Sequence, residues 1–164
     1  MKLRIAIDID DTILDWRGEY SKIFGDITKQ SQYQITRNVL KLSRNRDFWS
    51  NLPLLEYPDF VPEIYSTKRI NSKTYTRNNL RKHNLPVRPI YQTLTQTGNK
   101  VDIIKGVADI LIDDSPFNVE QALEVGFPAL LIVREHNKHS NIKHKINSLM
   151  LDEIYEAYED LMNE

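Results

Sequence analysis

The chain has 164 residues, which suits one domain with at most a small insertion. Its hydrophobic fraction of 40% and net charge of -1 are those of an ordinary globular protein without overall attraction for polyanions. The absence of cysteine excludes disulfides, thiolate zinc sites and a cysteine nucleophile. No apolar run has the length of a signal peptide or a membrane span, so we expect a cytoplasmic protein without membrane contact or stable nucleic-acid binding.

Short apolar runs predict the strands. The runs LRIAI (3–7), ADILI (108–112) and PALLIV (128–133) are continuous rather than alternating, which is typical of strands covered on both faces. A weaker run, VPEIYS (61–66), predicts a fourth strand, in which Pro62 is tolerable only near the start or at an edge.

Helical patterns alternate with these strands. In the segment 115–126, Ser115 is placed to cap a helix, Pro116 suits its first turn and Gly126 suits its end. The alternation of strand and helix predicts an α/β fold with a parallel sheet. The three helix-like segments lie at residues 71–84, 99–107 and 115–126.

Between residues 13 and 60 the pattern changes to amphipathic helical segments at 16–25 and 32–44, followed by an aromatic stretch. Because this insertion follows the first strand directly, it can cover a site at the strand ends as a lid. We predict a catalytic core of residues 1–12 and 61–164 with a small helical cap at 13–60.

Two segments close the chain. Residues 151–162 (LDEIYEAYEDLM) predict an amphipathic helix packed on the sheet. Residues 134–145 hold three histidines and several basic residues, but no cysteine or carboxylate cluster completes a metal site there. We interpret that stretch as a solvated loop.

Aspartates follow two of the predicted strands. Asp8 and Asp10 follow the first, and Asp113 and Asp114 follow another. Ligands of open parallel sheets bind beyond the carboxyl ends of the strands, so these side chains can converge. Carboxylates are rarely buried without a counter-charge, and Mg²⁺ prefers such oxygen ligands. We therefore predict that all four aspartates bind Mg²⁺, whereas Asp11 reads as a capping or turn residue.

The motif order resembles that of the haloacid dehalogenase superfamily, from Lys2 to about Val133. The motifs are D-x-D-D-T at 8–12, S-T-K-R at 66–69, then Lys100, and D-D at 113–114. Each motif alone is weak, but together and in this order they are specific. The resemblance implies a Rossmann-like three-layer parallel sheet with a small helical cap inserted after the first strand.

The resemblance also implies roles in phosphoryl transfer. Asp8 matches the nucleophile that forms an aspartyl-phosphate, and Asp10 matches the acid/base that protonates the leaving alkoxide and then activates water. Thr67 matches the hydroxyl of the second motif, and Lys100 matches the lysine that neutralises transition-state charge. The cofactor implied is Mg²⁺.

A closer similarity is to the C-type 5'(3')-deoxyribonucleotidases, which implies a nucleoside monophosphate as substrate. It rests on FW (48–49), TKR (67–69), LRKHNLPV (80–87), KVDII (100–104) and IDDSPFN (112–118). The residues expected to contact the substrate are Ser66, Lys68, Arg69, Phe48 and Trp49.

Three points depart from that pattern or stay open. Ser66 competes with Thr67 for the second motif, although the spacing to Arg69 favours Thr67. Lys105 competes with Lys100, although the start of a helix is the better place to meet phosphate. The segment 51–63, with three prolines, is too broken for the helix that family members have there, so the core is trimmed or the chain passes extended.

We therefore predict a Mg²⁺-dependent phosphomonoesterase acting on a small phosphate ester, in first place a nucleotide. The alternatives are a phosphatase for another small ester or for a nucleic-acid 3'-phosphate end, which only the basic segments 67–83 and 134–145 support, and a non-catalytic binding module. A receiver domain is disfavoured because its aspartate pair precedes the phosphorylated aspartate. A homodimer is left open.

Overall fold

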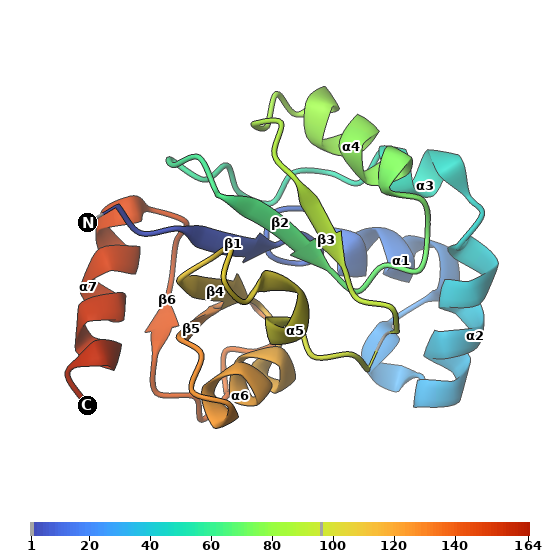
Figure 1. The fold of residues 1–164 in the computed structure, drawn as a ribbon. Helices are drawn as coiled ribbons and strands as arrows, with labels where there is room; N and C mark the ends of the chain where they lie inside the picture. Colours follow the sequence, from blue (N-terminus) through green and yellow to red (C-terminus); the bar gives the residue numbers. More distant parts are fainter. Residues whose placement is uncertain (1, 96) are drawn as a thin grey trace.

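A parallel sheet of six strands forms the centre of the molecule, in the order β3-β2-β1-β4-β5-β6 (Figure 1). The computed structural model describes residues 2–95 and 97–164. All pairings between neighbouring strands are parallel, as the alternation of strands and helices predicted. The strands are β1 (Ile5–Asp8), β2 (Ile64–Thr67), β3 (Ile90–Gln92), β4 (Ile110–Asp113), β5 (Ala129–Ile132) and β6 (Lys145–Ile146).

The four predicted strands correspond to β1, β2, β4 and β5, each of which is buried along its whole length. The sequence pattern did not predict β3 and β6, which lie at the two edges of the sheet. These strands are only three and two residues long and are partly exposed, so neither carries a continuous apolar run.

Six helices agree with the predicted segments within a few residues at each end, whereas the short helix at 46–50 and the 3₁₀ turn at 27–29 were not predicted. The predicted C-terminal helix at 151–162 is confirmed with the same bounds. Gly126 ends α6 with a positive φ of 72°, but the Ser115 side chain makes no capping hydrogen bond within the described part of the chain. The helices are α1 (Trp16–Phe24), α2 (Gln32–Leu42), α3 (Arg46–Ser50), α4 (Lys73–Lys82), α5 (Val101–Ile104), α6 (Pro116–Glu124), α7 (Leu151–Met162) and the 3₁₀ turn η1 (Ile27–Lys29).

Helices cover both faces of the sheet, which explains why the strands are apolar at every position. On one face, Ala6 and Leu111 pack in a cluster with Val119 of α6. On the other face, Ile7 packs in a cluster that includes Ile154 of α7 and residues of the cap and α4. The protein therefore has three layers.

The segment between β1 and β2 carries α1, η1, α2 and α3. After α3, residues 51–63 pass to β2 without a helix, which settles the alternative left open above. The backbone there is held by pairing with the start of the segment: Asp15 N donates to Pro53 O at 2.9 Å and Leu55 N donates to Ile13 O at 2.8 Å. The prolines of this stretch prevent an intact helix.

The two central strands β1 and β4 mark the point where the strand order reverses. From β1 the chain moves outward through β2 and β3, and it then returns to β4 on the other side of β1. In such sheets the carboxyl ends of the strands at the reversal open into a crevice. Asp8 and Asp113 are the last residues of β1 and β4, so both lie at this crevice. Among residues 2–95 and 97–164, we find no helix long and apolar enough to cross a membrane.

Candidate active site

Three carboxylates meet at the carboxyl ends of β1 and β4. One oxygen each of Asp8, Asp113 and Asp114 lies within 4.8 Å of the others. All three residues are buried, with exposed fractions of 6%, 0% and 7%. The fold thus joins two motifs that lie more than 100 residues apart in the sequence.

Among the described residues, Lys100 provides the positive charge that faces these carboxylates. Its ammonium forms an ion pair with Asp8 and lies 2.6 Å from Asp113 Oδ2, and the residue is 2% exposed. Burial acts to lower the pKa of Lys100, but the carboxylates of Asp113 and Asp8 outweigh it and hold the pKa above its usual value. Lys105 is exposed at the end of α5, so Lys100 is the lysine that reaches the aspartates.

The cluster holds more negative charge than one lysine offsets. Burial raises the pKa of Asp8 well above its usual range; Lys100 opposes that shift, and Asp113 and Asp114 reinforce it. Burial also raises the pKa of Asp114, against the hydrogen bond from His136. Three convergent carboxylates with excess negative charge fit the ligand preferences of a divalent cation such as Mg²⁺.

Asp10, the fourth predicted metal ligand, lies outside this cluster. Its carboxylate forms a bidentate ion pair with Arg69. Arg69 Nη2 lies 2.6 Å from Asp10 Oδ1, and Arg69 Nε lies 2.8 Å from Asp10 Oδ2. The two-residue spacing places side chains on one side only within a strand, and β1 ends at Asp8. Arg69 is 4% exposed, donates to Thr76 Oγ1 at 2.9 Å and lies 5.0 Å from the centre of the Trp49 ring.

The two hydroxyls of the second motif are both buried at the end of β2. The Thr67 hydroxyl accepts a hydrogen bond from Arg69 N at 3.1 Å, so it shapes the turn that carries Arg69. Ser66 pairs with Asp8 across the sheet, and its buried hydroxyl has no hydrogen-bond partner within residues 2–95 and 97–164. Neither side chain lines the cavity that opens above the aspartates.

A cavity of about 270 Å³ opens above the aspartates. Its walls come from α2, through Gln32, Ile35, Thr36 and Val39, and from Trp49 of α3. Part of the cavity wall therefore comes from the segment between β1 and β2. The sequence pattern did not reveal these α2 residues, because cap helices carry no motif.

The other predicted contacts divide between the cavity and the core. Lys68 lines the cavity, with its ammonium 5.4 Å from the centre of the Phe117 ring. Phe48 does not line the cavity; it is buried in the core and packs edge-on against Trp49, with ring centres 5.0 Å apart. Of the FW pair, Trp49 alone can therefore contact a ligand in this cavity.

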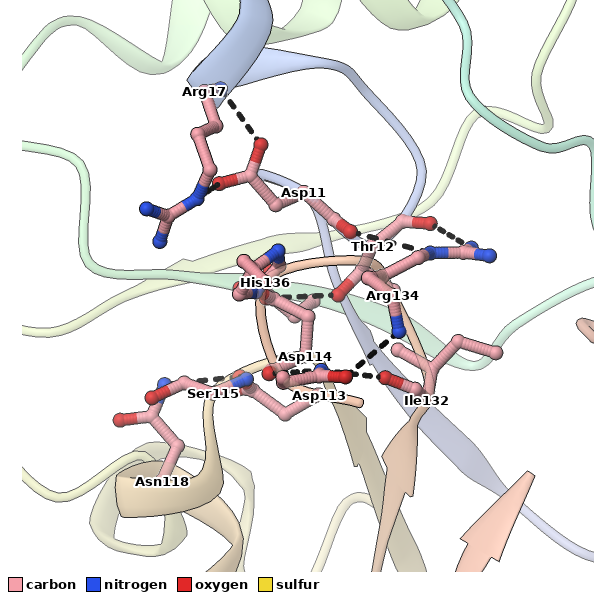
Figure 2. A network of polar contacts seen from close by, with 12 residues as sticks. Asp11, Thr12, Arg17, Asp113, Asp114, Ser115, Asn118, Ile132, Arg134 and His136 are labelled. Atoms are coloured by element: carbon pink, nitrogen blue, oxygen red, sulfur yellow. Dashed lines mark hydrogen bonds and ion pairs between the residues drawn. The ribbon is translucent and has the colours of Figure 1, made fainter. Parts of the chain in front are cut away.

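The loop after β5 braces both aspartate motifs (Figure 2). His136 Nε2 lies 2.8 Å from Asp114 Oδ2, and the Arg134 guanidinium donates to Thr12 O at 2.6 Å. Asn137 donates to the carbonyls of Asp114 and Ile132. Our interpretation of this stretch as a solvated loop is thus wrong for these residues, because its polar side chains satisfy buried backbone groups.

Two further residues orient the aspartates. Asn118 Nδ2 contacts both carboxylate oxygens of Asp113, at 3.0 and 3.1 Å. It lies in the first turns of α6, and the quoted IDDSPFN motif contains it. Asp11, which has a positive φ of 62°, accepts a hydrogen bond from Arg17 N at 2.7 Å and so acts in the turn into α1, as expected. Burial raises the pKa of Asp11 to about 7.

Substitution of Asn137 tests the brace. Asn137→Ala leaves the carbonyls of Asp114 and Ile132 without this donor, so we expect the free energy of unfolding to fall by about 2 kcal/mol. Urea denaturation measures this change. The matched substitution of the exposed Asn141 to alanine should change the unfolding free energy by less than about 0.5 kcal/mol. Equal effects of the two substitutions would contradict the role given to Asn137.

Comparison with known proteins identifies the fold. No family model matches the chain, and no curated protein matches it significantly by sequence. Among solved structures, an L-2-haloacid dehalogenase has a TM-score of 0.59 at 12% identity, covering 91% of this chain and 96% of the other. The fold is that of the haloacid dehalogenases. A second structure, of a dehalogenase, has a TM-score of 0.50 at 14% identity, covering 94% of this chain and 96% of the other.

At these identities the likeness concerns the fold. The structural neighbours bear the name of the superfamily that the motifs resemble, and the predicted α/β, Rossmann-like parallel sheet is confirmed. The dehalogenase fold places its two central strands as the motif argument required, with Asp8 and Asp113 side by side at their ends.

Proposed function

We propose that the protein is a Mg²⁺-dependent phosphomonoesterase that acts through an aspartyl-phosphate on Asp8, with a nucleoside monophosphate as substrate. The observation that carries the proposal is the joint position of Asp8, Asp113, Asp114 and Lys100 on the floor of one cavity. These clustered carboxylates form ion pairs with a lysine and face a cavity. Such an arrangement is suited to bind a cation together with an anionic substrate.

The residues divide the reaction between them. An Asp8 oxygen attacks phosphorus as the ester P–O bond breaks, and Asp10, once protonated, gives its proton to the leaving alkoxide. Asp10 then takes a proton from the water that releases phosphate from Asp8. Asp10 suits this exchange because it lines the cavity and stays partly exposed although it is paired with Arg69. Lys100 neutralises charge on the phosphoryl group.

A divalent cation held by Asp8, Asp113 and Asp114 would offset their charge and polarise a phosphoryl oxygen. The chain positions those ligands itself. Asn118 and Lys100 hold the Asp113 carboxylate, and Thr12 Oγ1 donates to Asp114 Oδ1 at 3.2 Å. Mg²⁺ is small and gives up its water ligands reluctantly, so it requires protein ligands that are already in position.

The nucleotide assignment rests on the cap side of the cavity. Trp49 borders the cavity although the residue is only 2% exposed, its ring lies 5.0 Å from the Arg69 guanidinium, and Lys68 lines the same cavity. An aromatic residue and two cations thus border the space for a base and a phosphate. Apolar side chains of α2, Ile35 and Val39, complete that wall. These contacts support a nucleoside monophosphate over a small sugar phosphate, which has no apolar ring system to bury.

Phosphate release from a panel of compounds tests the proposal. The panel holds deoxynucleoside and ribonucleoside 5'- and 3'-monophosphates, sugar phosphates and an L-2-haloacid, each with Mg²⁺ and with a chelator. We expect turnover of nucleoside monophosphates that the chelator abolishes and Mg²⁺ restores. Halide release from the haloacid without a metal, or no metal-dependent release from any ester, would overturn the proposal. Preference for sugar phosphates would overturn the substrate assignment alone.

A further inference from the structure

Two segments of the chain carry basic residues and no acidic ones. Residues 27–46 and 64–101 together hold 13 of the 22 lysines and arginines and none of the 23 aspartates and glutamates. The other residues therefore carry a large negative charge. The net charge of -1 sums two regions of opposite sign, so it says nothing about the local field that a ligand meets.

Two helices present these charges to solvent in rows. On α2, Arg37 and Lys41 are exposed and four residues apart; on α4, Lys73, Arg77 and Arg81 are exposed at the same spacing. Residues four apart lie on one side of a helix, about 6 Å apart along its axis. We call these five residues, with the exposed Arg44 that follows α2, the basic face.

The basic face has no counter-charge of its own. Within residues 2–95 and 97–164, none of its six side chains has a carboxylate within 4.0 Å. Basic residues elsewhere do: Arg4 pairs with Asp109, Lys138 with Glu135, and Lys143 with Glu164. Concentrated charge of one sign repels itself, so a face without internal partners is suited to an anionic ligand.

On α2, the basic face and the active-site cavity lie on different sides of the helix: Gln32, Ile35, Thr36 and Val39 line the cavity, and Arg37 and Lys41 point away from it. α2 supplies one wall of the cavity, and Lys68, Arg69 and Ile70 on the approach to α4 supply another. α3 follows α2 and packs against α4, which brings the two helices to one end of the molecule, opposite to the acidic α7 (Figure 1). An anionic chain that touches both helices would therefore lie along that end of the molecule.

We propose that the basic face binds single-stranded nucleic acid. Regularly spaced positive charges match a regularly charged phosphate backbone. Tyr33, which is 75% exposed, precedes Arg37 by one helical turn and offers an aromatic surface on which an unpaired base can stack. Bases of a duplex are unavailable for that contact, which favours a single strand.

Binding is tested with fluorescein-labelled 12-nucleotide DNA and RNA strands of mixed sequence, followed by anisotropy from 25 to 200 mM KCl without Mg²⁺. Contact with all six basic residues predicts a slope of log K against log salt of about -4. The triple variant Lys73→Glu, Arg77→Glu and Arg81→Glu should bind at least about tenfold more weakly and lower the slope magnitude by about 2. Comparison of the affinities for the DNA strand and the RNA strand shows which backbone the protein prefers.

The matched control is the triple variant Lys22→Glu, Lys105→Glu and Lys138→Glu, which changes the net charge by the same amount outside the basic face. It should bind as the unaltered protein does, within about twofold. Thermal melting checks that each variant folds. If the α4 variant does not fold, the variant Arg37→Glu, Lys41→Glu and Arg44→Glu on α2 takes its place, with the same expected loss.

Three outcomes overturn the proposal: no binding at 25 mM KCl, equal weakening by the control variant, or equal affinity for a duplex or polyphosphate of the same charge. Tyr33→Ala should weaken strand binding by about fivefold or more and leave polyphosphate binding unchanged. Because no turnover is measured, the result is independent of whether the cavity hydrolyses phosphate esters.

Discussion

Asp8→Asn should lower the rate of phosphate release by at least about 1,000-fold with every substrate that the unaltered protein hydrolyses. The amide of asparagine is a poor nucleophile. Neither Asp113 nor Asp114 can act as the nucleophile in its place, because hydrogen bonds with Asn118, Thr12 and His136 hold their carboxylates. Steady-state kinetics with Mg²⁺ and the best nucleotide of the panel measure the effect.

Asp11→Asn is the matched control, because it makes the same chemical change three residues further along the same motif. Asp11 faces Arg17 and not the cavity, so turnover should stay within about tenfold of the unaltered rate. Circular dichroism establishes that both variants fold. An Asp8→Asn protein that keeps its turnover would exclude an aspartyl-phosphate on Asp8.

Lys100→Ala should lower the free energy of unfolding by about 3 kcal/mol in the absence of metal, because it leaves Asp8 and Asp113 buried without their cation. The loss should shrink as the pH falls, since protonated carboxyls need no counter-charge. Urea denaturation at several pH values measures both effects. Phosphate release should fall as well, because the ammonium that meets the phosphoryl group is gone.

Lys105→Ala provides the comparison, since Lys105 is the other lysine of the same short helix region and is exposed. Its unfolding free energy should change by less than about 0.5 kcal/mol. Added Mg²⁺ should stabilise Lys100→Ala more than it stabilises the unaltered protein, because three uncompensated carboxylates bind a cation more tightly. A larger loss from Lys105→Ala would reverse the assignment of the third motif.

The balance of charge in the site links these expectations. Three buried carboxylates and one buried lysine leave a deficit of positive charge, and the structure fills part of it with hydrogen bonds from Asn118, Thr12 and His136. A site arranged in this way gains stability from a bound cation and gains reactivity from an anionic substrate that arrives with one.

The central strands and the last helix could be predicted from the sequence. Continuous apolar runs ending in aspartate identify β1 and β4, because strands covered on both faces can carry polar residues only at their ends. The amphipathic period identifies α7 with its bounds, since that helix buries one stripe and exposes the rest. The order of the motifs, which is purely a property of the sequence, indicated the fold that the solved dehalogenase structures share.

The contacts between side chains in the site depend on how distant elements pack together. The packing pairs Asp10 with Arg69 and not with the other aspartates, and it brings Lys100 and not Lys105 to Asp8. Phe48 and Trp49 both belong to the core, but only Trp49 also borders the cavity. The packing also draws Asn137 from a stretch that reads as a solvated loop into contact with the Asp114 backbone. Such contacts join residues far apart in the chain, and local patterns describe only neighbours within a few residues.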